Sequence, residues 1–265
     1  MGDMQPALRK VNVTRYVMPL REGGSLPAIA EADDNFLYVL KFSGAGQGVR
    51  ALIADLIGGE IARSLGFKVP EIVLANLDSA FGRTEADEEI QELLRKSEGL
   101  NLGIHYLAGA ISFDAAVVTI DPLVASQIVW LDALLTNVDR TARNTNMLMW
   151  KIELWLIDHG AALYFHHSGG DWMEQAMRPF VPIKDHVLLP FASKLETVDT
   201  IFKTLLTKER IQSVIELIPH EWLAENTFNA TAAEMKNIYV QFFITRIQLS
   251  DIFVKEAQHA RTSLI

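Results

Sequence analysis

The sequence contains no cysteine among its 265 residues. Disulfide bonds and thiolate metal sites are therefore excluded, and this composition is typical of an intracellular protein. The sequence also lacks an apolar run of the about 18 residues that a membrane-spanning helix requires. Its first residues, MGDMQPALRK, have no apolar signal core. We expect a cytoplasmic protein with no membrane partner.

The sequence also has fewer basic residues than acidic residues. Lysine and arginine total 24 against 33 aspartates and glutamates, which gives a net charge of -9. This balance argues against a nucleic-acid-binding surface, so no nucleic acid is expected as a partner, and it disfavours docking on anionic membranes. Apolar residues make up 49% of the chain, as in an ordinary globular protein with ample core for one large domain or two lobes.

The first part of the chain is rich in strand patterns. Short β-branched and aromatic runs bounded by turn residues predict an N-terminal antiparallel sheet with a helix at about residues 50–65. The loop SGAGQG before this helix lacks the Gly-Lys-Ser/Thr ending of a Walker A motif. An acidic, solvated helical segment is expected at 78–99, and irregular chain at 99–114. The predicted strands are residues 11–18, 28–31, 36–42 and 71–77.

Helical patterns dominate the remainder, with a β-hairpin as the exception. Two histidines at 166 and 167 are adjacent, so their side chains diverge, and we expect a surface pair rather than a metal site. We therefore predict an α+β fold with two lobes: a sheet lobe at 1–77 and a mostly helical lobe at 78–265. The predicted helices are residues 121–135, 194–206, 208–217 and 232–257.

The chain is organised around residues 128–160. Asp139 and Asn144 stand five positions apart in a polar break, and Asp158 follows the apolar run Leu154–Ile157. The runs MLMW and ELWLI between them predict the β-hairpin. Two acids and an amide at the ends of short strands can hold Mg²⁺ on the phosphates of a nucleotide and accept a hydroxyl proton.

Lys41 and Asp55 are a second candidate pair. Asp55 lies among small and apolar residues of its predicted helix, and a buried acid needs a partner, for which Lys41 at the end of a strand is suited. Two plainer interpretations stay open: Lys41 as a solvated lysine on an edge strand, and Asp55 as a cap or turn acid in a helix broken at 58–59. Glu60 is expected to pair with Arg63 on the surface.

The order of these parts is that of kinase-type phosphotransferases, with a D-x4-N loop, a hairpin and a D-x-G turn. The sequence resembles the HipA-like kinase domain family, a relative of the protein kinase and phosphatidylinositol kinase folds. Most of the first two-thirds of the chain carries the resemblance, and NVDRTARN with LIDHGAAL is its specific part. The resembling segments are residues 38–74, 99–110, 129–148 and 154–163.

The resemblance implies ATP and Mg²⁺ as ligands and phosphoryl transfer to a hydroxyl. It implies that Asp139 is the catalytic base, that Asn144 and Asp158 are the Mg²⁺ ligands, and that Lys41 holds the ATP phosphates with Asp55 as its acidic partner. The family's phosphate loop would fall at about residues 21–27, which would make Ser25 an ATP-binding residue and a candidate for autophosphorylation.

Several positions depart from the related families. Asn137 and Val138 stand where protein kinases have His-Arg, and His159 replaces the Phe of their D-F-G motif. Thr141 replaces the His of the phosphatidylinositol kinase D-R-H motif, and Asp55 replaces a Glu. We also expect the chain to be too short to hold the extra N-terminal subdomain of full-length HipA toxins, so substrate and toxin–antitoxin behaviour are not carried over from them.

We expect a kinase that transfers the γ-phosphoryl group of ATP to a hydroxyl acceptor, with a protein serine or threonine preferred over a lipid or small molecule. A nucleotide-binding pseudokinase acting as a regulatory partner is the alternative from another class. The plainest alternative is an α+β protein whose acids are ordinary turn residues. The sequence names no particular acceptor and no oligomeric state.

Overall fold

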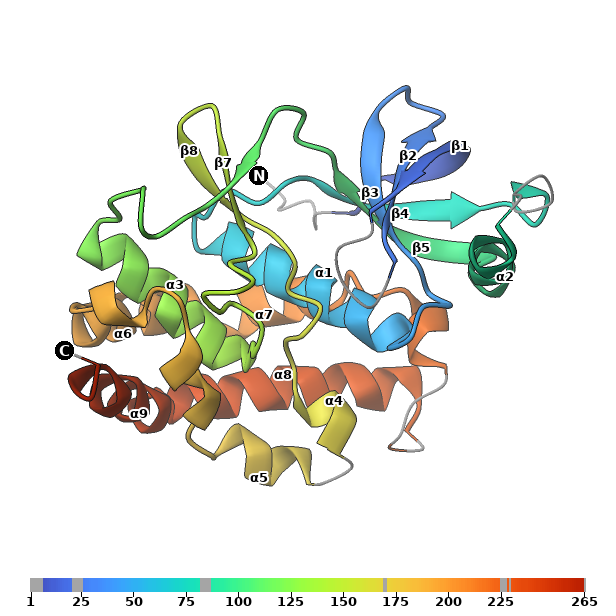
Figure 1. Ribbon diagram of the computed structural model, residues 1–265. Helices are drawn as coiled ribbons and strands as arrows, with labels where there is room; N and C mark the ends of the chain where they lie inside the picture. Colours follow the sequence, from blue (N-terminus) through green and yellow to red (C-terminus); the bar gives the residue numbers. More distant parts are fainter. Residues whose placement is uncertain are drawn as a thin grey trace, which may run out of the picture.

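The computed structural model describes residues 7–20, 26–81, 87–168, 171–224, 228 and 230–264. A β-barrel and a layer of helices form its two parts, with a helix running between them (Figure 1). The strands are β1 (Lys10–Pro19), β2 (Ala28–Ala32), β3 (Leu37–Lys41), β4 (Ile72–Leu77), β5 (Gly99–His105), β6 (Ile111–Ser112), β7 (Met147–Trp150) and β8 (Glu153–Leu156).

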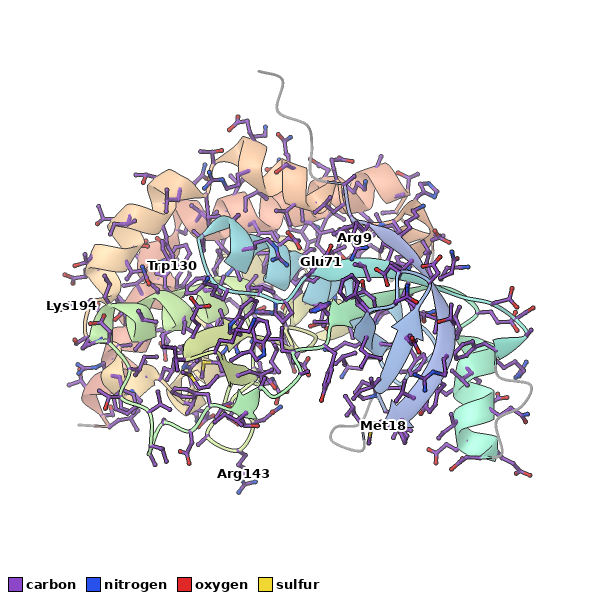
Figure 2. The ribbon with its side chains drawn as sticks, turned by 90° about the horizontal axis from the view of Figure 1, so that it is seen from above. Arg9, Met18, Glu71, Trp130, Arg143 and Lys194 are labelled. Carbon is purple, nitrogen blue, oxygen red and sulfur yellow. The ribbon has the colours of Figure 1, made fainter. Side chains whose placement is uncertain are left out.

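The expected N-terminal sheet is closed on itself, in the order β1-β2-β3-β5-β4. Four strand pairs are antiparallel, as predicted, but β1 and β4 close the barrel in parallel, with Lys10 opposite Leu74. Arg9, just before β1, reinforces this closure because its Nε donates to Glu71 Oε1 at 2.7 Å. Both side chains lie on the barrel side of the molecule in Figure 2.

Strand β5 corrects one sequence expectation. Residues 99–105 were expected to be irregular, yet they pair with both β3 and β4. Gly103 suits this position because an added Cβ would lie 2.8 Å from Val73 Cγ2. The barrel therefore extends beyond residue 77, where the sequence analysis ends the sheet lobe; the position of the lobe boundary stays a prediction.

The acidic segment before β5 forms helix α2 (Glu88–Lys96), as predicted. The side chain of Asp87 caps its start by accepting hydrogen bonds from the N–H groups of Glu89 and Ile90. Most side chains of the helix are exposed. This helix touches the loop after β3: Ser97, at its end, accepts a hydrogen bond from the Gly44 N–H.

Helix α1 (Val49–Ser64) is buried on most sides, as Asp55 at 2% exposure illustrates. One side packs against the outer face of the barrel, where Ile72 and Leu74 belong to the large core. The alternate residues Val73 and Ala75 point into the smaller barrel core, as strand periodicity requires. A helix between two layers needs apolar side chains all round, which its sequence supplies.

The predicted hairpin is present as β7 and β8, and β6 adds a third strand beside β7. Lys151 and Ile152 make its tight turn with φ angles of 49° and 62°, a left-handed pair that matches the twist of the strands. The N–H of Leu156 donates to the carbonyl of Lys68, so β8 is fastened to the chain that follows α1.

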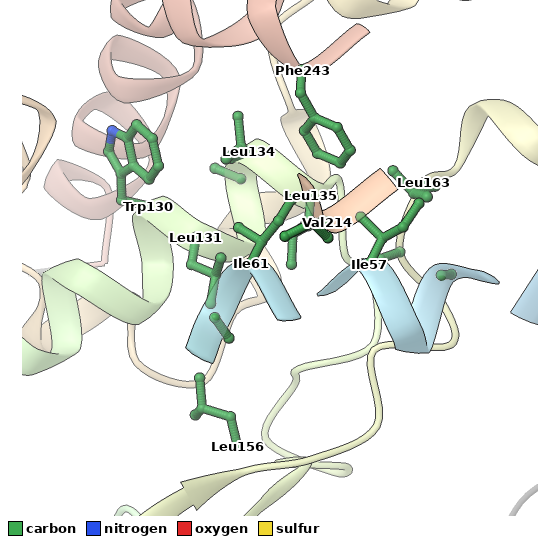
Figure 3. Packing of buried hydrophobic residues seen from close by; sticks show 14 of the residues in the cluster. Ile57, Ile61, Trp130, Leu131, Leu134, Leu135, Leu156, Leu163, Val214 and Phe243 are labelled. Carbon is green, nitrogen blue, oxygen red and sulfur yellow. The ribbon is translucent and has the colours of Figure 1, made fainter. Parts of the chain in front are cut away.

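The remaining described chain is mainly helical and forms the large core together with α1 (Figure 3). The single helix expected at 232–257 is two helices, because the chain breaks at Leu249. The other elements are α3 (Pro122–Leu135), α4 (Phe165–Ser168), α5 (Trp172–Ala176), η2 (Val181–Asp185), η3 (Leu189–Phe191), α6 (Leu195–Leu205), α7 (Lys208–Ile215), η4 (His220–Leu223), α8 (Ala232–Gln248) and α9 (Ser250–Thr262).

Across the described ranges, none of the helices has the length and apolar character to cross a membrane.

Candidate active site

The loop that carries Asp139 begins where α3 ends. Thr136 takes a left-handed conformation with φ of 54°, and this turns the chain out of the helix. The side chain of Asn137 then accepts a hydrogen bond from the Asp139 N–H at 3.2 Å. Thr141 and Asn144 exchange backbone hydrogen bonds, which closes the polar break into a compact loop. The exposed Arg143 projects from the rim of this loop in Figure 2.

Lys41, Asp55 and Asp158 meet in one cluster. The Nζ of Lys41, at the end of β3, lies 2.6 Å from Asp55 Oδ2 and 2.6 Å from Asp158 Oδ1. The predicted pairing of Lys41 with Asp55 is therefore confirmed, and both plainer interpretations are wrong. The predicted surface pair of Glu60 with Arg63 is also confirmed, at 3.2 Å.

The turn at residues 158–160 is pressed against α1. Asp158 has a left-handed backbone with φ of 52°, and the N–H of His159 donates to Asp55 Oδ1 at 2.6 Å. A Cβ on Gly160 would lie 3.0 Å from Asp55 Oδ2, and one on Gly58 would lie 2.5 Å from the Cβ of His159. The two glycines therefore allow the D-x-G turn and the helix to approach closely.

Asp139 is held by two amides. Asn144 Nδ2 donates to Asp139 Oδ2 at 2.7 Å, and Asn146 Nδ2 donates to the same oxygen at 3.3 Å. The expected association of Asp139 with Asn144 is therefore present. Asn146 was not singled out by the sequence analysis, although it is nearly buried while Asn144 is exposed.

Burial and charge set the ionisation of the cluster. Burial opposes the charged form of Lys41, but the charges of Asp55 and Asp158 outweigh it and raise the pKa of Lys41. Burial raises the pKa of Asp55 to about 6 against the opposing charge of Lys41. Asp158 is also desolvated, yet the charge of Lys41 and its hydrogen bond lower its pKa. At pH 7 the cluster therefore consists of one ammonium and two carboxylates.

Asp139 has a different environment. Burial raises its pKa, the nearby charge of Asp158 adds to that effect, and the hydrogen bonds from Asn146 and Asn144 oppose it. A raised pKa makes a carboxylate a better proton acceptor. The two acids come from opposite ends of the hairpin, and Asn146 connects them: its side chain donates to Asp139, and its carbonyl accepts from the N–H of Ile157, the residue before Asp158.

A second charged group lies beneath the loop. Asp132 of α3 is fully buried and accepts hydrogen bonds from Arg140 Nε at 2.5 Å, His186 Nε2 at 2.9 Å and Asn137 Nδ2 at 2.9 Å. His186 Nδ1 accepts from the Leu188 N–H at 3.0 Å, so the ring is neutral and carries its proton on Nε2. Asp132 and Arg140 are therefore an ion pair in the core.

Two sequence predictions have other outcomes. Ser25 and most of the expected phosphate loop lie outside the described residues. His166 is 4% exposed and its Nε2 bonds to the hydroxyl of Tyr239 at 2.8 Å, so the expected surface position of His166 is wrong. The side chain of His167 lies outside the described part.

The sequence reasoning missed Asp132, Arg140, Asn146 and His186. Asp132 had a usable signal, because it is a lone acid in an apolar helix, the same pattern that singled out Asp55. Arg140 had none, since it lies in a polar stretch, and His186 had none, since its burial depends on a contact with a distant segment.

The donor set suits a magnesium–nucleotide complex. Asp158 is a carboxylate whose side chain is 44% exposed, and Asn144 supplies an amide oxygen beside Asp139. The described residues contain no cluster of three or more His, Cys, Asp or Glu side chains that could hold a metal ion. Mg²⁺ in such sites takes one or two carboxylates and completes its shell with substrate phosphates and water, so these residues fit that use.

Comparison with solved structures finds kinases among the similar folds. The structure matches the proinflammatory kinase CtkA of Helicobacter pylori with a TM-score of 0.52 and 14% identity, over 98% of this chain and 99% of the other. A Golgi casein kinase, solved with Mn and ADP bound, matches with a TM-score of 0.46 and 11% identity, over 97% of this chain and 75% of the other. No curated protein matches the chain.

A two-lobed fold with this lysine–acid arrangement defines a kinase-type phosphotransferase. The model of the HipA-like kinase family matches residues 13–255. The chain therefore belongs to the HipA-like kinase family, and it is an ATP-dependent kinase.

Proposed function

We propose that this kinase transfers the γ-phosphoryl group of MgATP to a serine or threonine hydroxyl of a protein. The proposal rests on how these side chains converge. Lys41 Nζ lies 2.6 Å from both Asp55 and Asp158, and Asp139 accepts hydrogen bonds from the amides of Asn144 and Asn146. Phosphoryl transfer needs a lysine that binds the phosphates, an acid and an amide that bind the metal ion, and an acid that accepts the proton.

Each residue has a distinct task in this proposal. Lys41 binds the phosphates of ATP, and Asp55 keeps its ammonium in position. Asp158 and Asn144 would hold Mg²⁺, which would supply positive charge to the phosphates. Asp139 orients the acceptor hydroxyl. The hydroxyl oxygen bonds to the γ-phosphorus, the bond to the β,γ-bridging oxygen breaks, ADP leaves with that electron pair, and the hydroxyl proton passes to Asp139.

The negative charge of the chain favours a protein acceptor over a lipid surface. The net charge of -9 disfavours anionic lipid surfaces, and it favours an acceptor with basic character. Myelin basic protein is therefore a suitable generic acceptor for assays.

The decisive experiment compares Asp139→Asn with Asp158→Asn. Asp139→Asn removes the base while keeping size and hydrogen-bonding capacity, so it should leave MgATP affinity nearly unchanged and lower transfer on the order of 10²-fold or more. Asp158→Asn removes a charged metal ligand, so affinity and transfer should fall together. Calorimetric binding and radiolabelled transfer to the chain itself and to myelin basic protein measure both.

A pseudokinase, the alternative class, would give another pattern. Wild type would bind MgATP without transferring phosphate to any acceptor, and Asp139→Asn would be indistinguishable from it. That result would replace the catalytic assignment with a regulatory one.

A further inference from the structure

Asn146 occupies a special position directly before β7. Its backbone is left-handed, with φ of 46°, and the residue is 7% exposed. Its side chain donates to Asp139 Oδ2, the oxygen that also receives Asn144. No hydrogen bond from the described residues reaches the other oxygen, Oδ1. The two donors on Oδ2 fix the orientation of the Asp139 carboxylate, and Oδ1 stays available to the hydroxyl of an acceptor.

The backbone of Asn146 connects this carboxylate to the other half of the site. Its carbonyl oxygen accepts a hydrogen bond from the N–H of Ile157 at 3.1 Å, and Ile157 directly precedes Asp158. The same carbonyl accepts from Nη1 of Arg140. A single residue therefore contacts Asp139 through its side chain and the strand end before Asp158 through its main chain.

The anchor of this arrangement lies in the core. Arg140 and Asp132 have fully buried side chains and form a 2.5 Å ion pair, so the guanidinium that holds the Asn146 carbonyl is itself fixed to α3. Asn144, in contrast, sits on an exposed loop, where its amide gains little support from packing. The buried amide is the better source of a constant carboxylate orientation.

We propose that Asn146 is a positioning residue for phosphoryl transfer. It holds the Asp139 carboxylate so that Oδ1 faces the acceptor hydroxyl, and it fixes the position of this oxygen relative to Asp158. This inference rests on the proposed function, in which Asp139 receives the hydroxyl proton. Asn146 acts through Asp139 and does not itself touch the reacting atoms.

The test uses Asn146→Gly in the full chain. Glycine adopts φ of about +46° without strain and keeps the carbonyl that Arg140 and Ile157 contact, so this variant removes only the side-chain amide. The single-turnover rate of transfer to myelin basic protein should fall on the order of 10-fold to 100-fold, as small misplacements of reacting groups do. MgATP affinity by calorimetry and the urea unfolding midpoint should stay near wild type.

Two further variants complete the comparison. Asn35→Gly makes the same substitution at a left-handed position with φ of 63° in the β2–β3 turn, so it should transfer at the wild-type rate. Asn146→Asp keeps the shape but places a carboxylate against Asp139, so its transfer should be slower than that of Asn146→Gly.

Transfer by Asn146→Gly at the wild-type rate would overturn the inference and leave the proposed function intact. A parallel loss of MgATP affinity or of folded protein would also overturn it, because the residue would then act on binding or on the fold. Absence of transfer by wild type would overturn both the inference and the proposed function.

Discussion

At the scale of single residues, the arrangement around Lys41 separates a buried acid from a surface acid on the same helix. Asp55 has 1% of its side chain exposed and shares Lys41 with Asp158. Glu60, one and a half turns later, pairs with Arg63, whose side chain is 39% exposed. A buried ionic partner is costly to remove, whereas an exposed pair contributes little.

We expect Asp55→Ala to weaken ATP use while the fold survives. The variant leaves Lys41 with Asp158 alone, so the ammonium is drawn toward the metal ligand and away from the phosphates. KM for ATP should rise on the order of 10-fold, and stability should fall by about 3 kcal/mol, the cost of breaking a buried pair. Steady-state kinetics and urea unfolding measure both quantities.

Glu60→Ala is the matched control, with an expected loss of less than about 1 kcal/mol and unchanged kinetics. If Glu60→Ala abolished activity and Asp55→Ala were neutral, the assignment of the helix acid would be reversed.

At the scale of elements, Asp132 joins α3 to the loop that follows it and to a third segment that is distant in sequence. It sits on α3, receives Arg140 from the loop that carries Asp139, and receives His186 from the segment after η2. Thr141 and His186 also form a β-bridge. The ion pair between Arg140 and Asp132 therefore anchors the loop to α3. This anchor explains how an irregular segment can keep a defined geometry.

This ion pair predicts a pH dependence of stability. Burial alone would raise the pKa of Asp132, but the charge of Arg140 and the contact with His186 outweigh it, so the folded-state pKa lies below the unfolded value of about 3.9. At pH values between these two pKa values, Asp132 is protonated in the unfolded chain and ionised in the folded chain. The contribution of Asp132 is therefore fully present above the unfolded pKa and is lost as pH falls through the folded one.

Asp132→Asn should accordingly cost about 3–5 kcal/mol at pH 7, because Arg140 loses its buried partner. The stability gap to wild type should narrow as pH falls from 5 toward 3. Urea unfolding at several pH values measures the gap, with the exposed Asp185→Asn as a control that should track wild type throughout. A gap that stayed constant down to pH 3 would contradict the assigned ion pair.

Some elements could be predicted from sequence and others could not, for physical reasons. Strand β3, helix α1 and the hairpin have periodic apolar patterns and turn residues of their own, so local rules find them. Strand β5 does not, because Gly103 is required by crowding against Val73 and its pairing with β3 and β4 is set by the closed barrel. The break at Leu249 is equally nonlocal, since Ser250 there bonds to Asp199 across the fold.

The candidate site divides in the same way. Lys41, Asp55, Asp139, Asn144 and Asp158 carried signals in their spacing or in a polar position within an apolar stretch. Asn146 carried none, because the contact of its side chain with Asp139 depends on a left-handed backbone that no local pattern reports.

At the scale of the whole molecule, α1 belongs to both parts of the fold. It carries Asp55 toward Lys41 of the barrel and packs Ile57 and Ile61 into the helical core (Figure 3). A ligand that contacts Lys41 and Asp158 together therefore ties the barrel to the helical part, and it should stabilise the molecule as a unit.

Millimolar MgATP should raise the melting temperature, because ligand bound to the folded state alone stabilises it by mass action, by about 2.7 kcal/mol at 100 times Kd. ATP with EDTA should raise it less, since Asp158 and Asn144 would then lack the metal they are proposed to hold. Scanning fluorimetry measures both shifts. No shift at saturating MgATP would count against nucleotide binding at this site.

The parallel contact between β1 and β4 has a consequence for how the chain is made. Lys10 leaves the ribosome early, but its partner Leu74 follows much later, and the barrel also needs β5, which ends at His105. Until then the nascent strands present unpaired edges, the form of chain most prone to pairing with a neighbour. Strand β1 is therefore synthesised well before the strands that close the barrel around it. Lys41, in turn, gains both of its acidic partners only when translation has passed Asp158.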